Sequence, residues 1–121
     1  MPRTRYIPKA YHDLPTVPFI DVEQAWFWFI RCQQARRDGA RFDTVSGGVR
    51  RPCDPDDIYR AAAGLKRRGA VSGAHLRVLA AYGLAGRPPD PRCREEVWPA
   101  RLWAEALDRL TTVLKAKGIV E

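Results

Sequence analysis

The clearest helix signal in the chain lies in DPDDIYRAAAGLKRRG, residues 54–69. Asp54 is a favoured N-cap residue, Pro55 fits the first helical position, and the two aspartates that follow oppose the positive end of the helix dipole. Apolar side chains then recur at helical spacing until Gly69, a residue type that commonly ends helices. The stretch predicts a helix over 55–68 with one buried face.

The segment before it predicts another helix, over 22–38. Asp21 offers an N-cap, with Gln24 three positions on as in a capping box, and a glycine follows the segment. The middle of the segment, AWFWFI, is apolar on every face, whereas a surface helix shows an apolar stripe. Two interpretations follow: the helix is central to the core, or an aromatic face with Trp26 and Trp28 is open for docking a protein.

Two further helices are predicted after residue 69. The first, over 73–82, begins after Ser72 and is expected to end at Gly83. The second, over 93–117, is the longest. A kink or a restart is expected within it at Pro99, because proline lacks the backbone donor that a helix interior uses.

The rest of the chain predicts irregular structure. Residues 1–20 carry four prolines, so we expect an extended arm that lies across the domain. Residues 40–53 contain Ser-Gly-Gly and predict a loop. The predicted fold class is therefore all-α, a single domain over 21–121 that follows the proline-rich arm, with four helices at about 22–38, 55–68, 73–82 and 93–117. A chain of 121 residues suffices for one hydrophobic core.

The net charge is the strongest indication of a partner. There are 21 Lys and Arg against 14 Asp and Glu, a formal charge of +7. Polyanions are the natural ligands, nucleic acid first and an anionic membrane surface second, whereas the alternative is a surface charged for solubility alone. No stretch approaches the roughly 18 apolar residues of a membrane span, and three cysteines do not make a disulfide framework. We expect a soluble, cytoplasmic protein without a membrane segment.

Residue types suited to catalysis or metal binding are scattered. Cys32, Cys53 and Cys93, together with the two histidines, lack the spacing of a metal module, so buried thiols are the expected role. Cys53 or Ser72 could act as a nucleophile with His75 as the base, but Ser72 is also expected as an N-cap and His75 as a polar residue of the first helical turn. We expect no enzyme, no metal, no cofactor and no small-molecule substrate.

The basic residues gather at helix ends and in loops. Arginine guanidiniums there suit contact with phosphates, although helix C-termini favour cations in any case. If the first two helices lie antiparallel, the clusters at their ends separate instead of forming one patch. The residues predicted to contact nucleic acid are Arg36, Arg37, Arg41, Arg50, Arg51, Lys66, Arg67, Arg68, Arg92, Arg94 and Arg101.

Residues 51–83 resemble the lead-in of sigma-factor region 4 and of phage antitermination proteins of the Q type. The residues that carry the resemblance are Arg51-Pro52-Cys53-Asp54, Asp56-Asp57, Leu65, Leu76-Arg77-Val78-Leu79 and Tyr82-Gly83. The resemblance implies a helix-turn-helix that reads promoter DNA. The chain departs from that pattern after Gly83, where three prolines stand in place of the first helix of the DNA-reading pair. By analogy, the helix over 93–117 would take the recognition position, with its first arginines toward the bases.

The predicted function is that of a DNA- or RNA-binding, transcription-associated regulatory protein, which contacts phosphates through arginine-rich loops and helix ends. The alternative is a protein-interaction adaptor or a homodimer. It would use the aromatic face of the helix over 22–38 and the proline-rich arm.

Overall fold

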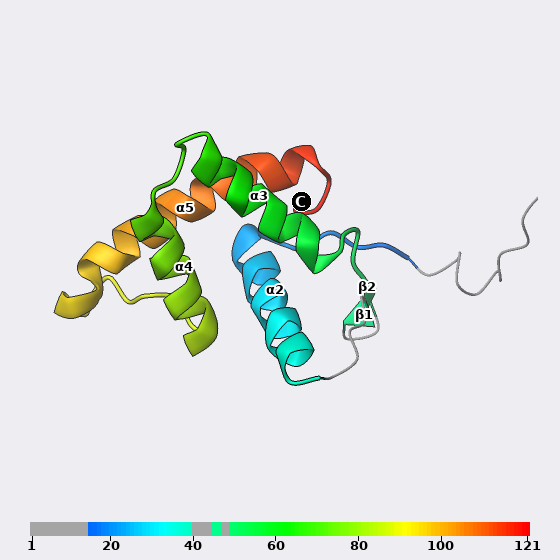
Figure 1. The fold of residues 1–121 in the computed structure, drawn as a ribbon, viewed down its shortest axis with the longest axis horizontal. Coiled ribbons are helices and arrows are strands. Elements are labelled where there is room, and N and C mark those ends of the chain that lie inside the picture. The colour runs from blue at the N-terminus through cyan, green and yellow to red at the C-terminus, as the bar shows by residue number, and fades with distance from the viewer. Residues whose placement is uncertain (1–14, 40–44, 47–48) are drawn as a thin grey trace, which may run out of the picture.

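The computed structural model describes residues 15–39, 45–46 and 49–121. Its helices are α2 (Val22–Arg37), α3 (Pro55–Arg67), α4 (Gly73–Ala85) and α5 (Val97–Ala116), and a 3-10 turn, η1 (Arg94–Glu96), precedes α5 (Figure 1). Two short strands, β1 (Val45–Ser46) and β2 (Val49–Arg50), pair antiparallel. The predicted all-α class with four helices is confirmed. Residues 1–14 of the predicted arm, and Arg41, lie outside the described residues.

The starts of α2 and α3 follow from the predicted caps. Asp21 Oδ1 accepts a hydrogen bond from the Gln24 backbone N–H at 2.8 Å. Asp57 Oδ2 accepts one from the Asp54 N–H at 2.9 Å, which closes the capping box of α3. Gln24 departs from the predicted capping box, because its side-chain oxygen accepts from the Ile20 N–H instead.

The predicted end of α4 is wrong. The helix passes through Gly83 and continues to Ala85, and Gly86 takes the left-handed C-cap with φ 76°. Gly83 stays in the helix because α2 lies against it: a Cβ at this position would come within 2.8 Å of Ile30 Cγ1. The glycine therefore serves close helix packing and does not end the helix.

The predicted start of α5 is also wrong. Residues 93–96 do not join the helix. The Glu96 carboxylate accepts hydrogen bonds from the Arg87 guanidinium at 2.8 and 2.9 Å and from the Asp90 backbone N–H at 2.7 Å. This clamp holds the residues before α5 in a tight turn. Pro99 neither kinks nor restarts the helix, since it is the third residue of α5, where a backbone N–H has no intrahelical partner.

The loop predicted over 40–53 contains, in its described part, the β1–β2 pair. Residues 15–20 run between β2 and the C-terminal segment (Figure 1). The Val17 N–H donates to the Arg50 carbonyl at 2.9 Å, and the Phe19 N–H donates to the Ile119 carbonyl at 2.9 Å. The prediction that the arm lies across the domain is confirmed for residues 15–20.

Helix α2 is central to the core and contacts α3, α4 and α5. The Trp28 ring lies 5.1 Å from that of Phe19, and the Trp26 ring lies 5.0 Å from that of Phe29. Trp26 and Trp28 are 6% and 3% exposed. Both side chains therefore belong to the core, and Trp26 also lines a hollow where α2, α3 and α4 meet.

Candidate nucleic-acid interface

The α3–α4 unit carries several cations, and a long stretch of its sequence contains no carboxylate. Between Asp57 and Asp90 the sequence has no acidic residue and six basic ones, which are Arg60, Lys66, Arg67, Arg68, Arg77 and Arg87. All of α3 after its first turn, the following turn and all of α4 lie in this stretch. Arg60 pairs with Asp57 and Arg87 pairs with Glu96, at the two ends of this stretch. The four cations between them have no acidic neighbour in the stretch itself.

Four of these cations flank the turn that joins α3 to α4, and together they are termed the basic corner: Lys66, Arg67, Arg68 and Arg77. All four residues are exposed. Within the described part of the chain, none of them forms an ion pair with a carboxylate. Their charges are directed to the solvent and remain available to a ligand.

Small residues set the direction of three guanidiniums. A Cβ on Gly64 would lie 3.3 Å from Arg68 Nη1 and 3.7 Å from Arg67 Nη2, so both side chains turn back along α3. A Cβ on Gly73 would lie 3.4 Å from Arg77 Nη1, so this side chain lies over the first turn of α4. Guanidinium groups thus lie on either side of the turn.

The helix dipole explains only part of the basic corner. Lys66 and Arg67 stand in the last turn of α3, where a cation stabilises the negative helix end. Arg77 stands in the first half of α4, where the dipole gives a cation no such benefit. The stability of its own helix therefore does not explain a cation at this position.

Three residues predicted to contact nucleic acid form contacts within the described part of the chain. The Arg51 guanidinium lies 4.3 Å from the Phe19 ring centroid, and its Nη1 donates to the Val17 carbonyl at 3.2 Å. Arg36 Nη1 pairs with Asp56 at 3.4 Å and ties the end of α2 to the start of α3. Similarly, Arg92 pairs with Asp90 at 3.3 Å.

The remaining predicted residues do not gather at one place. The end of α2, the end of α3 and the start of α5 lie at different edges of the fold (Figure 1). Arg37 is exposed at the first of these edges, and Arg94 and Arg101 are exposed near the last. Of the predicted set, Lys66, Arg67 and Arg68 belong to the basic corner.

Two exposed residues were not among those predicted from the sequence to contact a ligand. Arg77 was treated only as part of the family resemblance, although the lack of acidic residues over 58–89 marks it as one of the cations of this unit. Trp98, in the first turn of α5, is 60% exposed, with the Arg101 guanidinium 5.6 Å from its ring centroid. No pattern in the sequence separates this tryptophan from the buried ones.

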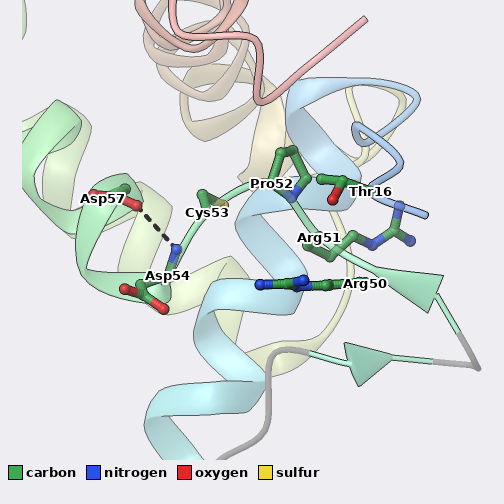
Figure 2. Close-up of a pocket in the computed structure, with 7 residues that line it drawn as sticks. All are labelled: Thr16, Arg50, Arg51, Pro52, Cys53, Asp54 and Asp57. Carbon is green, nitrogen blue, oxygen red and sulfur yellow. Dashed lines mark hydrogen bonds between the residues drawn. The ribbon is translucent and has the colours of Figure 1, made fainter. Parts of the chain in front are cut away.

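A polar depression of about 360 Å³ lies beside β2 and the start of α3 (Figure 2). Arg50 and Arg51 face it from one side and Asp54 and Asp57 from the other, so its charges balance. Burial, with the nearby Asp57 carboxylate, raises the pKa of the Cys53 thiol to about 12. The thiol stays protonated at neutral pH, which suits a small apolar group and not a nucleophile.

Ser72, His75 and Glu105 form a chain of contacts that looks like a catalytic triad. Ser72 Oγ lies 2.8 Å from His75 Nδ1, and His75 Nε2 lies 2.8 Å from Glu105 Oε1. The Ser72 backbone N–H also donates to Nδ1 at 3.0 Å, so the one lone pair of that nitrogen is already engaged. The arrangement caps α4 and fixes it to α5, as the N-cap prediction for Ser72 requires.

No three His, Cys, Asp or Glu side chains come together as a potential metal site in residues 15–39, 45–46 and 49–121. None of the helices in this part of the chain has the length and apolar character needed to cross a membrane. No family model, curated protein or solved structure matches the chain. The resemblance to sigma-factor region 4 and to the antitermination proteins therefore stays a prediction.

Proposed function

We propose that the protein binds nucleic acid by placing the basic corner against the phosphate backbone, in a transcription-associated role. The observation that supports this function is the set of four exposed cations around the α3–α4 turn, within residues 58–89, which contain no carboxylate. The role in transcription is the part that comes from the family resemblance.

The chemistry of the basic corner suits phosphates. Its three arginines offer planar guanidiniums that bind phosphate oxygens in a bidentate way, and Lys66 adds a point charge. Such contacts carry little sequence information. We therefore expect binding to many sequences, with an affinity that falls steeply as salt is added. By the family resemblance, Arg94 of η1 and Arg101 of α5 are the residues proposed to meet bases.

The test is a fluorescence anisotropy titration of a short labelled duplex, DNA or RNA, at low salt. The informative variant is Arg68→Ala/Arg77→Ala. Its matched control is Lys115→Ala/Lys117→Ala, which removes the same charge from exposed positions at the end of α5. We expect the first variant to weaken binding by about tenfold or more and the control by about twofold at most.

Circular dichroism establishes that both variants are folded. The proposal is contradicted if the natural protein does not bind either duplex at low salt. It is equally contradicted if the two folded variants lose the same affinity, because the basic corner would then have no special part in binding.

A further inference from the structure

The outward face of α4 is apolar and largely uncovered. Of its 13 residues, Leu79 and Gly83 are buried, whereas Ala80, Ala81 and Leu84 are exposed. A surface helix normally turns a charged or polar face to water. The single Lys, Arg, Asp or Glu side chain in α4 is that of Arg77. The composition of α4 is therefore typical of a helix whose outer face is covered by another element or molecule.

This helix forms one wall of a groove along α2. A hollow of about 570 Å³ lies where α2, α3 and α4 meet, and another of about 340 Å³ continues between α2 and α4. Ile30, Gln33 and Ala80 line both hollows, so the two are parts of one groove. The helices α2 and α4 lie side by side, with α3 crossing beyond one end of the pair (Figure 1).

The groove has an apolar interior and basic ends. Lys66 and Arg67 line it at the end of α3, and Arg37 lines it at the end of α2. No carboxylate is among the described residues that line the two hollows. The Gln33 Oε1 atom is buried and has no hydrogen-bond partner in the described part of the chain. A ligand with apolar side chains and flanking negative charges would complement the interior and the ends of the groove.

We propose that the groove binds an acidic amphipathic helix of another protein. Apolar side chains at helical spacing would fill the two hollows, on either side of Ala80. Carboxylates of the same helix would pair with Lys66 and Arg67 at one end and with Arg37 at the other.

Charge and apolar surface together favour this occupant over two others. A second copy of the chain brings its own formal charge of +7 and the same basic groove ends, so the two copies repel. A nucleic acid would find cations at the ends of the groove but would leave its apolar interior without a partner.

The test uses a displayed library of helical peptides of about four turns, each with a varied apolar face and either an acidic or a basic polar face. The natural protein is expected to enrich acidic members. The best peptide is then titrated against Ala80→Glu and against its control Ala81→Glu, an exposed neighbour that does not line the groove. We expect Ala80→Glu to weaken binding by about tenfold and Ala81→Glu by about twofold at most.

Several outcomes would overturn this proposal. One is enrichment of basic peptides or of none, and another is an equal loss of affinity in the two variants with both folded by circular dichroism. Self-association of the natural protein that Ala80→Glu abolishes would assign the groove to a second copy. Weaker duplex binding by Ala80→Gln than by Ala81→Gln, a change that adds no charge beside Lys66 and Arg67, would assign the groove to nucleic acid.

Discussion

Arg51 illustrates how a single cation can be misjudged from its place in the sequence. It stands beside Arg50 and so belongs to a predicted phosphate-binding pair, yet its guanidinium holds residues 17–19. Its partners lie more than thirty positions earlier in the chain. No local sequence pattern connects two such distant segments. For this reason the charge of Arg51 alone led to the prediction that it contacts nucleic acid.

Replacement of Arg51 by alanine is expected to destabilise the fold. The change removes a cation–π contact with Phe19 and hydrogen bonds to the Val17 and Pro18 carbonyls, which together predict a loss of about 1–2 kcal/mol in the free energy of unfolding. Urea unfolding measures the loss. Arg37→Ala, at an exposed position, is the control and should change stability by less than about 0.5 kcal/mol. Equal stability of Arg51→Ala and the natural protein would contradict the structural role.

Two glycines in helix interiors should respond oppositely to the same substitution. Gly83→Ala would place a methyl group 2.8 Å from Ile30 Cγ1 and 2.9 Å from Trp26 Nε1, which predicts destabilisation by about 1–3 kcal/mol. Gly64→Ala meets only the mobile ends of arginine side chains and should gain about 0.5–1 kcal/mol from helix propensity. Thermal unfolding of the two variants checks this. Unchanged stability of Gly83→Ala would contradict the close α2–α4 approach, and a loss of stability in Gly64→Ala would contradict the free space expected around Gly64.

The three cysteines should differ in reactivity. Burial raises the pKa of the Cys32 thiol, and burial with the nearby Asp57 raises that of Cys53 to about 12, whereas Cys93 is only half-buried. A thiol-specific reagent at slightly alkaline pH should therefore modify Cys93 first and reach the other two only on unfolding. Mass spectrometry of the labelled peptides identifies the sites. Rapid labelling of Cys53 in the folded protein would show that the start of α3 is more open than described.

At the scale of the helices, three of the four starts and three of the four ends were predicted to within one residue, and one of each was wrong. Asp21, Asp54 and Ser72 act on residues within one turn, so their sequence neighbours suffice to identify a cap. The end of α4 depends on a contact between Gly83 and Ile30, and the start of α5 depends on Glu96 and Arg87. These partners come from other helices or turns, which a local pattern does not reveal.

The clamp before α5 should make stability depend on pH in a particular range. The Arg87 guanidinium lowers the pKa of Glu96 from its ordinary 4.5 to about 2. The contribution of this carboxylate is therefore fully present above pH 4.5 and is lost as the pH falls toward 2. Urea unfolding of the natural protein and of Glu96→Gln across this range measures the difference.

We expect the natural protein to be the more stable of the two at pH 7 and the difference to shrink below pH 4.5. Arg87→Ala should show the same trend, because it removes the other half of the pair. A difference that does not change with pH would mean that the ion pair contributes nothing to the clamp.

At the scale of the whole molecule, the distribution of charge is more informative than its total. The sum of +7 indicates a polyanionic partner without saying where it binds. The sequence of α4, and that of α3 after its first turn, contains no carboxylate, and the four cations of the basic corner form no ion pair in the described part of the chain, which distinguishes them from Arg60 and Arg87. Lys66, Arg67 and Arg68 could be proposed from the sequence. The groove could not, because it exists only where α2, α3 and α4 meet.

The two proposed surfaces share Lys66 and Arg67 but differ in the residues that test them. Arg68 and Arg77 do not line the groove, and Ala80 carries no charge that could meet phosphate. Failure of one proposal would leave the other intact.

The most direct measurement is the dependence of duplex affinity on salt concentration for the natural protein and for Arg68→Ala/Arg77→Ala. Each cation that neutralises a phosphate contributes roughly 0.9 to the slope of the logarithm of the association constant against the logarithm of salt concentration. With the four cations of the basic corner engaged, the natural slope should be about −3 to −4, and the variant should lose about 2 of it. A slope near zero for the natural protein, or the same slope in both proteins, would contradict binding through the basic corner.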